Sequence, residues 1–321
     1  MAESRLVSGT RDRSRLAGDQ VADHGRHDAA PECVPPISVV VPVHNEALIL
    51  RRFLTALISG AAPHELDVIV VCNGCTDGSA EVARSIGPPV RVLEIPQASK
   101  IDALNAGDEA AEALPRVYLD ADVDVNVEAV RRVAEVLRSG QALVAAPTLT
   151  VDLRDSGWLV RAYYAVWLRL PWVRDDIVGS GFYAVSAAGR QRFDRFPDVL
   201  GDDLWVSALF ERHERRSVRD VTFTIRPPRT VRQLVRRRAR AIHGNEEVRA
   251  VLPSGRTAYR RQGAALYVLR QQPRLAPQVA AYLGLSVVAE IGARRRRQRG
   301  DRRWISEERV ALRPTNGQRD A

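Results

Sequence analysis

The sequence is nearly devoid of lysine: Lys100 stands alone against 47 arginines in 321 residues. A lysine ammonium is a compact point charge on a flexible stem, whereas an arginine guanidinium is a planar fork, so the two are not interchangeable. The retention of one ammonium where every other basic position is arginine favours a specific role for Lys100. The alternative is the chance survival of one surface lysine.

Cysteine is scarce, and the first residues lack an apolar run. Three cysteines make a disulfide framework unexpected. Two of them form the pair Cys72-Asn-Gly-Cys75, which by itself is weak evidence for zinc or redox chemistry, and we interpret it as the end of a strand followed by a turn. Residues 1–35 are polar and charged, so we expect a disordered segment and no secretory signal.

Charge is divided unevenly along the chain. Residues 36–210 have 16 basic and 23 acidic side chains, net −7, whereas residues 211–321 have 27 arginines and 10 acids, net +17. Such an excess of arginine predicts an anionic partner, which could be nucleic acid, anionic lipid or a phosphorylated substrate. Apolar residues make up 45% of the sequence, which is enough for a sizeable core.

Apolar runs and helical periodicity alternate through the first half of the chain. Short β-branched runs predict buried strands at residues 37–43, 67–72, 90–95, 116–119 and 142–150. Helical spacing predicts helices at residues 47–59, 80–86, 99–114 and 128–139. This alternation predicts an α/β fold with a mostly parallel central sheet. A helix is expected to start at Gly201, and the remainder of the chain is expected to be a helical, Arg-rich tail.

Polar residues gather at the predicted carboxyl ends of these strands. Glu46 follows the first strand, Asn73 and Asp77 follow the second, and Asp120 and Asp122 follow the fourth. In parallel sheets, ligands bind at the carboxyl ends of the strands. A lone ammonium near a carboxylate pair at such an edge is suited to a nucleoside diphosphate.

Six short motifs occur in a fixed order. They are Pro42-Val-His-Asn-Glu46, Asn73-Gly-Cys-Thr-Asp-Gly-Ser79, Lys100-Ile-Asp-Ala-Leu-Asn105, Asp120-Ala-Asp122, Gly179-Ser-Gly181 and Gly201-Asp-Asp203. Each is weak alone, but in this order they are specific. Over roughly residues 37–245 the chain resembles family 2 glycosyltransferases, which use nucleotide-sugars and have the GT-A fold. The resemblance implies a GT-A type nucleotide-binding α/β/α sandwich.

The resemblance also implies a divalent cation, Mg²⁺ or Mn²⁺. Asp122 matches the metal-coordinating acid of the family, and Asp120 matches the acid that contacts the ribose or a metal-bound water. Hard cations prefer oxygen ligands, and a cation neutralises the charge that develops on a leaving diphosphate. The alternative for this pair is a solvated acidic loop.

By the same resemblance, Asp203 is the base and Asp202 its neighbour. An inverting transfer needs a base that takes the proton from the acceptor hydroxyl. Both residues could instead be acids that favour the N-terminus of a helix. Gly181 would let the backbone approach the substrate closely, unless its turn is simply tight.

The resemblance implies that ten residues bind the nucleotide-sugar donor: Pro42, Asn45, Glu46, Asn73, Asp77, Lys100, Asp120, Gly181, Arg237 and Arg240. Asn73 departs from the family, which usually has an Asp at this position that contacts the nucleobase of the donor. The identity of that nucleobase is therefore not predicted. Glu46 matches a ribose-contacting acid or is a helix N-terminal acid, and Asp77 is a ligand or a turn and cap residue. The arginines of 236–240 match loosely a motif that closes over the diphosphate; a solvated or lipid-facing charge run is the alternative.

Two segments indicate an apolar partner. Residues 279–289 are mostly apolar and are followed by Arg294–Arg297; they are too short and polar for a confident span but suit an anionic interface. Residues 158–172 hold three of the five tryptophans and could lie at the same interface or bind a lipid-linked acceptor. Packing onto the catalytic core is the alternative for both.

The sequence therefore predicts a disordered segment at 1–35, a catalytic domain at 36–245 and a basic helical extension at 246–321. We expect an inverting, metal-dependent glycosyltransferase of cell-envelope glycan, glycolipid or secondary-metabolite biosynthesis, cytoplasmic or peripheral on the inner face of the cell membrane. One rival is a GT-A-like nucleotidyltransferase, but no Gly-rich phosphate loop with Lys or Arg lies near residue 42. Another is a non-catalytic nucleic-acid-binding protein, but the tail has no recognised motif and few aromatics, so we expect no nucleic acid partner.

Overall fold

The computed structural model describes residues 36–298, except for residues 175, 178–179 and 253–262. The segment 1–35, which we expect to be disordered, lies outside the described residues, and so does Gly179 of the glycine-rich motif.

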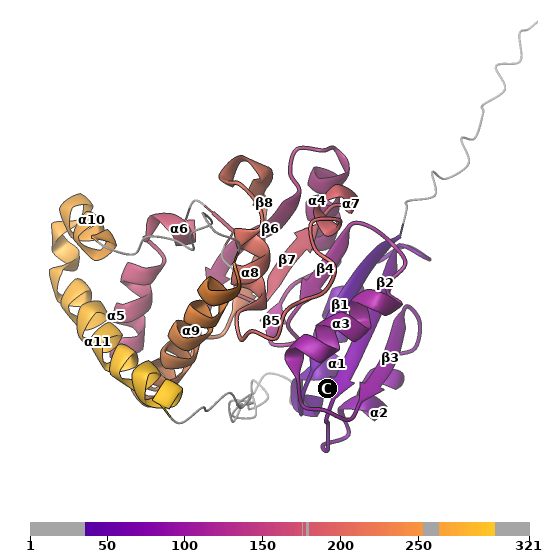
Figure 1. Ribbon diagram of the computed structural model, residues 1–321, viewed down its shortest axis with the longest axis horizontal. Helices are drawn as coiled ribbons and strands as arrows, with labels where there is room; N and C mark the ends of the chain where they lie inside the picture. The colour runs from indigo at the N-terminus through magenta and orange to yellow at the C-terminus, as the bar shows by residue number, and fades with distance from the viewer. Residues whose placement is uncertain (1–35, 175, 178–179, 253–262, 299–321) are drawn as a thin grey trace, which may run out of the picture. The chain divides into compact units, whose positions relative to one another are not determined.

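One sheet of eight strands forms the centre of the described part of the chain (Figure 1). The strand order is β3-β2-β1-β4-β7-β6-β8-β5. The strands are β1 Ile37–Val43, β2 Leu66–Asn73, β3 Val90–Ile95, β4 Arg116–Leu119, β5 Val123–Asp124, β6 Val144–Val151, β7 Phe182–Val185 and β8 Arg215–Ile225. Strands β3, β2, β1 and β4 pair in parallel, as predicted, whereas β7 is antiparallel to both β4 and β6.

Helices cover both faces of the parallel half of the sheet. They are α1 Ala47–Ile58, α2 Ser79–Arg84, α3 Lys100–Ala110 and α4 Val127–Arg138. Helix α3 packs against β1 and β2, while α1 contacts α2 and α4. Right-handed crossovers place α3 on the face opposite α1 and α2. At Gly107 of α3, an added Cβ would lie 2.4 Å from Cγ1 of Val40, so only glycine permits this close packing. The predicted α/β/α sandwich is confirmed.

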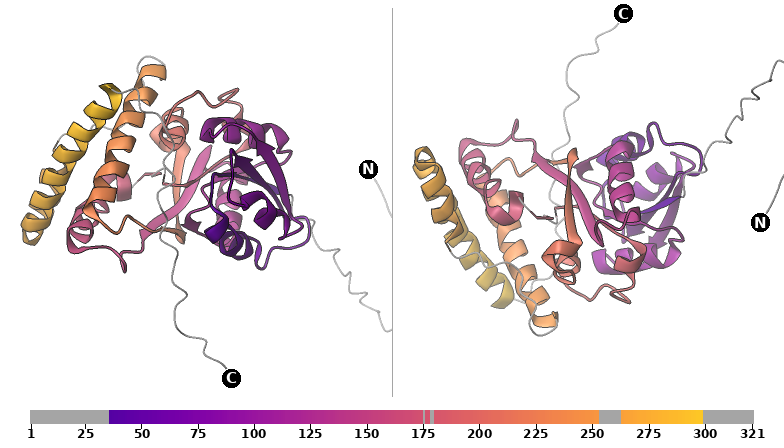
Figure 2. Two further views of the ribbon diagram at one scale, coloured as in Figure 1. Left: turned by 90° about the horizontal axis from the view of Figure 1, so that it is seen from below. Right: turned by 90° about the horizontal axis from the view of Figure 1, so that it is seen from above.

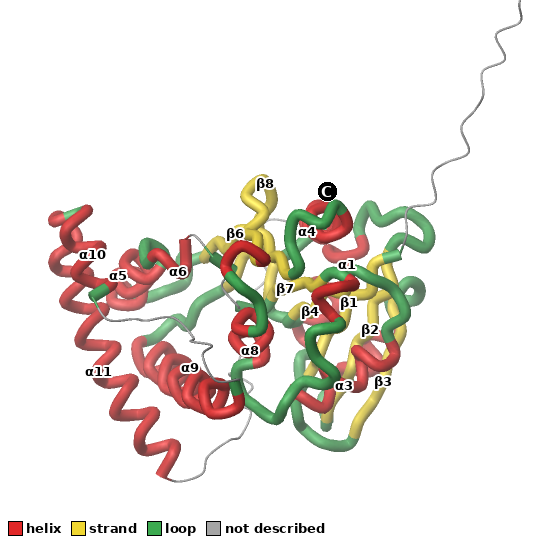
Figure 3. The backbone as a smooth tube through the Cα atoms, turned by 45° about the horizontal axis from the view of Figure 1, so that its top comes forward, coloured by secondary structure: helices red, strands yellow, loops and turns green. Residues whose placement is uncertain are grey.

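The other helices follow the antiparallel half. They are α5 Trp158–Trp167, α6 Pro171–Arg174, α7 Ala187–Arg190, α8 Asp202–Ala208, α9 Val231–Val251, α10 Ala264–Gln271 and α11 Ala276–Gln298. Helix α11 packs along α9 and α5 (Figures 2 and 3). Helix α9 runs through the domain boundary expected at residues 245 and 246 without a break.

Two expectations about secondary structure are wrong. The helix predicted for residues 99–114 ends at Ala110, because Pro115 disfavours helical backbone at the preceding residue. The Arg116 guanidinium donates instead to the carbonyls of Asp108 (2.9 Å) and Ala111 (2.7 Å) at the helix end. The tail after residue 210 is not wholly helical, because residues 215–225 form β8.

Candidate functional site

The loops after β1 and β2 are fastened to each other. The backbone N–H of Thr76 donates to Asn45 Oδ1 (2.8 Å), and that of Ala47 donates to Asp77 Oδ2 (3.0 Å). Burial alone would raise the pKa of Asp77, but hydrogen bonds from Ser79 and Ala47 hold it below its usual value. Asn45 and Asp77 therefore brace these loops, and Asp77 caps the start of α1.

Asn73 is fully buried at the end of β2. Its side-chain Nδ2 donates to the backbone carbonyl of Val43 (2.7 Å). The backbone carbonyl oxygen of Asn73 lies 2.6 Å from Nδ1 of His44. Its buried Oδ1 makes no hydrogen bond among the described residues. In this structure Asn73 joins β2 to β1 and does not line the neighbouring cavity.

A cavity of about 320 Å³ opens where the parallel strands end. This volume is at the lower end of the range for small-molecule sites. Its walls include ten of the residues that the sequence predicts: Pro42, Glu46, Lys100, Asp120, Asp122, Gly181, Asp202, Asp203, Arg237 and Arg240. Segments far apart in the sequence thus meet at one place, while Asn45, Asn73 and Asp77 lie outside the walls.

Lys100 lies between two carboxylates of the cavity. Its Nζ is 2.8 Å from Oδ1 of Asp120 and 3.0 Å from Oδ1 of Asp202. Burial alone would lower the pKa of Lys100, but Asp120, Asp202 and Asp203 outweigh it and raise the pKa. The other oxygen of Asp202, Oδ2, accepts a hydrogen bond from the Tyr183 hydroxyl (3.1 Å). Asp202 is therefore held at both oxygens in a buried ion pair.

Asp203 is less constrained than Asp202. It lies in the first turn of α8, partly exposed, and its Oδ1 accepts a hydrogen bond from the Leu204 amide (2.6 Å). Burial and the charge of Asp202 raise the pKa of Asp203 to about 6, although Lys100 opposes them. A carboxylate whose pKa lies near neutrality can take up and release a proton at physiological pH.

Asp120 and Asp122 follow β4 at the edge of the cavity. The Asp120 amide donates to the carbonyl of Gly181 (2.8 Å). Gly181 has φ of 100°, and an added Cβ would lie 3.1 Å from Cβ of Asp120 and 2.8 Å from Cγ1 of Val123. Glycine at this position therefore allows the strand that precedes α7 to approach the acidic pair closely.

Helix α9 brings arginines to the cavity. Arg237, Arg238 and Arg240 line the cavity, whereas Arg236 is exposed and does not. Burial lowers the pKa of Arg240, and the Asp120 carboxylate partly counteracts it. Three members of the arginine run at 236–240 thus line the same cavity as the acidic residues.

Aromatic side chains close the remaining side. Tyr163, Tyr164 and Trp167 of α5 and Trp172 of α6 line the cavity. Tyr163 stacks on Tyr282 of α11, with ring centroids 5.0 Å apart. The aromatic segment 158–172 therefore contributes both to the cavity and to the packing of α11.

Three residues of the site are not singled out by the sequence prediction, although Arg238 belongs to the predicted run at 236–240, and Tyr183 lies outside the cavity walls. Tyr183 holds Asp202 from β7, a pairing that no local pattern reveals. Arg238 lines the cavity beside Arg237. Ser207 also lines it, with a buried Oγ that makes no hydrogen bond among the described residues. Ser207 follows Asp203 by four residues on α8, so helical periodicity could have found it.

Few carboxylates of the cavity could hold a metal ion. Among the described residues, no three His, Cys, Asp or Glu side chains gather to hold a metal ion. The acids beside β4 would supply at most two ligands, which is the usual protein contribution where substrate phosphates complete the coordination of Mg²⁺. The donor set therefore fits a divalent cation bound together with a phosphorylated ligand.

Known proteins similar to this chain are glycosyltransferases. Glycosyltransferase AglD of Haloferax volcanii is 28% identical over 218 residues, covering 62% of this chain and 34% of its own. Glycosyltransferase AglE of the same organism is 35% identical over 94 residues, covering 28% of this chain and 31% of its own. The chain thus spans about a third of the length of these relatives.

Solved structures with the same fold include two glycosyltransferases. Mannosyltransferase PcManGT of Pyrobaculum calidifontis, in complex with GDP-Man and Mn²⁺, has a TM-score of 0.56 at 19% identity, covering 84% of this chain and 81% of its own. Glucosyl-3-phosphoglycerate synthase of Mycobacterium tuberculosis, with Mn²⁺, UDP and glucosyl-3-phosphoglycerate, has a TM-score of 0.51 at 21% identity, covering 69% and 82%. These likenesses show a GT-A-like fold.

The family model for glycosyl transferase family 2 matches residues 38–195. That match contains β1 to β4 with the acidic pair and β7 with Gly181. Over these residues, just under half of its length, the chain is similar to the glycosyltransferases of family 2.

Proposed function

We propose that the protein transfers a sugar from a nucleoside-diphosphate sugar to an acceptor hydroxyl with inversion at the anomeric carbon. The observation that supports this most is the division of charge in one cavity. Asp120 and Asp122 follow β4 and Asp203 lies at the start of α8, while Arg237 and Arg240 lie on α9. A cation–diphosphate complex needs carboxylates on one side and guanidinium groups on the other.

The donor diphosphate would lie against α9. Arg237 and Arg240 can each offer several N–H donors to phosphate oxygens. Pro42 and Glu46, at the end of β1, line the same cavity and would contact the nucleoside. In the proposal, Asn45, Asn73 and Asp77 shape the loops next to the nucleoside, and Asn73, which is buried, acts through the end of β2.

The divalent cation would be held by Asp122, with Asp120 beside it. Bound there, it would neutralise charge on the diphosphate leaving group. Lys100 already pairs with Asp120 and Asp202. Asp122 is therefore the acid of the pair that we assign to direct coordination, and we assign the ribose or a metal-bound water to Asp120.

Asp203 would act as the base. As the acceptor oxygen attacks the anomeric carbon, its proton passes to the Asp203 carboxylate, and the nucleoside diphosphate departs with the electrons of the broken bond. The Lys100–Asp202–Tyr183 contacts hold the preceding residue, so Asp203 is presented from a fixed helix start. The aromatic wall on α5 and α6 would contact the acceptor.

Turnover of a donor panel tests the proposal. Purified protein is incubated with UDP- and GDP-sugars and Mn²⁺, and release of nucleoside diphosphate is followed. We expect slow hydrolysis of one donor, its loss in chelator or in Asp203→Asn, and its retention in Asp220→Asn, a remote exposed acid paired with Arg132. If no donor is turned over, or if pyrophosphate is released from a nucleoside triphosphate and a sugar phosphate, the proposal is wrong.

We also propose that the C-terminal helices hold the enzyme at the inner face of the cell membrane, where it would serve cell-envelope or glycolipid synthesis. Large apolar side chains are exposed on α10 and α11: Leu266, Tyr267, Leu283, Val287, Val288 and Ile291. Although the apolar run 279–289 is too short for a confident span by itself, the helical stretch that contains it, Pro273–Gln298, is long and apolar enough to cross a membrane, and little of it is buried. The adjoining Arg294–Arg297 would favour anionic headgroups.

Lipid contact at this face would also bring the active site near the acceptor. Helix α11 packs along α5 and α9, and both of those helices line the cavity. If the outer face of α11 lies on the bilayer, the helices that line the cavity lie directly behind α11. This arrangement suits a lipid-linked acceptor.

A further inference from the structure

The segment that leads to Asp203 has no regular secondary structure. Residues 191–201 connect α7 to α8 without a helix or strand. Phe193 and Phe196 of this segment are nevertheless buried. A long irregular segment is the part of a fold expected to move most, yet this one leads directly into the first turn of α8, which has both acids.

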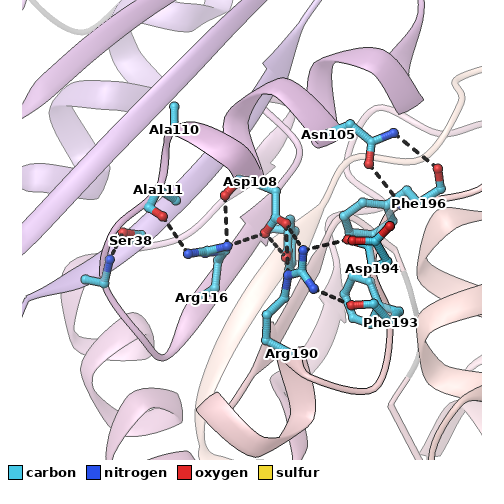
Figure 4. Close-up of polar contacts among 12 residues, drawn as sticks. Ser38, Asn105, Asp108, Ala110, Ala111, Arg116, Arg190, Phe193, Asp194 and Phe196 are labelled. Carbon is cyan, nitrogen blue, oxygen red and sulfur yellow. Dashed lines mark hydrogen bonds and ion pairs between the residues drawn. The ribbon is translucent and has the colours of Figure 1, made fainter.

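Asn105 fastens the middle of this segment to α3. The amide N–H of Phe196 donates to Asn105 Oδ1 (2.9 Å), and Asn105 Nδ2 donates to the carbonyl of Phe196 (3.1 Å) (Figure 4). A carboxamide has both an acceptor and a donor, so one side chain satisfies both polar groups of the Phe196 backbone. An Asp side chain at this position would lack the N–H donor, and a Leu side chain would lack both donor and acceptor.

Arg190 fastens the beginning of the segment. Its guanidinium donates to Oδ2 of Asp108 on α3 (2.9 Å) and to the carbonyl of Asp194 (2.8 Å), and it also bonds the carbonyl of Phe193 (Figure 4). Asp108 is buried and is held in addition by Arg116 (2.6 Å). The fork of Arg190 is thus oriented by a carboxylate that is itself fixed.

Aromatic contacts connect the anchored segment to the helix that bears Asp203. Phe196 packs on Tyr118 at 5.1 Å and on Trp205 at 5.9 Å between ring centroids. Trp205 is on α8, two residues after Asp203. Tyr118 also stacks on Tyr183 at 4.9 Å, and Tyr183 donates to Asp202. The two anchors therefore connect through packed rings to both sides of the helix start.

We propose that Asn105 and Arg190 are positioning residues for the transfer reaction, which hold segment 191–201 against α3 and thereby fix the carboxylate of Asp203. This inference rests on the proposed function. Neither side chain lines the cavity, so neither would contact donor or acceptor. Their effect on the reaction would pass through the placement of Asp203.

Kinetics separate positioning from substrate binding. In Asn105→Ala and Arg190→Gln, we expect kcat to fall about 10- to 100-fold, the range expected when a reacting group is displaced by about 1 Å. The KM for the donor should stay within about twofold, because Lys100, Asp122 and the α9 arginines are untouched. Arg190→Lys should recover part of kcat, since an ammonium keeps the ion pair but loses the fork.

A matched arginine supplies the control. Arg131 on α4 also pairs with a buried acid, Glu65, and bonds a backbone carbonyl, that of Gly60 (2.7 Å). It lies outside the cavity walls. Arg131→Gln should therefore weaken the fold much as Arg190→Gln does while leaving kcat unchanged.

Amide hydrogen exchange gives a second readout that needs no turnover. In the wild type the Phe196 amide should be protected, and Asn105→Ala and Arg190→Gln should accelerate exchange across residues 191–201, whereas Arg131→Gln should not. The inference is overturned if Arg131→Gln lowers kcat as much as Arg190→Gln, if kcat is unchanged in both positioning variants, or if exchange in 191–201 does not respond. A wild-type protein without transferase activity refutes the proposed function instead, and the exchange result still decides whether the anchors fix this segment.

Discussion

Turnover should rise with pH through about 6. Burial and the charge of Asp202 raise the pKa of Asp203 from 3.8 to about 6. A base works only when ionised, so about nine tenths of the enzyme would be active at pH 7 and about one tenth at pH 5. An aspartate with an ordinary pKa near 3.9 would lose about a tenth or less over the same interval. The expected tenfold fall is therefore specific to the environment of Asp203.

The assay measures kcat/KM from release of nucleoside diphosphate at low donor concentration, across about pH 4.5 to 8, because kcat/KM reports the pKa values of the free enzyme. Donor binding by calorimetry at the same pH values separates loss of base from loss of binding. In Asp203→Asn, turnover should fall by roughly 10²–10⁴-fold, the typical effect of losing a general base, and the acid limb near pH 6 should disappear. In Asp202→Asn the limb should move to lower pH, because the negative charge that helps to raise the pKa is gone.

Three results would refute this reasoning. The first is a wild-type limb near pH 4. The second is Asp203→Asn with more than half of the wild-type turnover or with the limb near pH 6 intact. The third is Asp202→Asn as the inactive variant while Asp203→Asn works.

Three further predictions concern metal, lipid and stability. Asp122→Ala should abolish metal-dependent binding of UDP or GDP in calorimetry, and Asp220→Asn should not; equal binding of every nucleoside diphosphate in chelator would contradict a metal role. Flotation of the protein with lipid vesicles should require anionic lipid and weaken with salt. It should be lost on deletion of residues 276–303 and in the double variant Val287→Asp/Ile291→Asp. A gel shift with generic DNA or RNA at physiological salt, without flotation, would favour a nucleic acid partner instead. Asp203→Asn should raise the free energy of unfolding at pH 7 by about 1–2 kcal/mol, because one pKa unit corresponds to about 1.4 kcal/mol and solvent screens a partly exposed carboxylate; a lower denaturation midpoint in urea would count against it.

The parallel half of the fold could be predicted because its signals are local. The run Ile37–Val43 is apolar throughout and is buried throughout, and the acids that follow β1 and β4 had to share one edge of a parallel sheet. Strand β8 was missed because its first half is polar and partly exposed, with arginines at 215, 216 and 219, and apolar residues alternate only from Val221 to Ile225. Strand β7 is four residues long, and its pairing with β4 is not encoded in nearby sequence.

The site could be predicted in composition but not in detail. Motif order brought Lys100, Asp122 and Asp203 together, yet it could not show that Asn73 is buried between β1 and β2, because that depends on side-chain packing. Charge alone could not distinguish Arg236 from Arg240, since only the rotation of α9 decides which arginine faces the cavity. Tyr183 is invisible to motifs, because its hydroxyl meets Asp202 only after two antiparallel strands have paired.

The ammonium of Lys100 offers an unusual reporter of this site. Because the chain has one lysine, isotopic labelling of lysine places a single side-chain signal in the protein, and that signal lies between Asp120 and Asp202. Its chemical shift would register a ligand or a cation that draws either carboxylate away. Acylating reagents react only with a neutral amine. Because its raised pKa keeps Lys100 protonated, Lys100 would stay unreactive while its two carboxylate partners are in place. Acylation at this one position would therefore record opening of the ion pair over time.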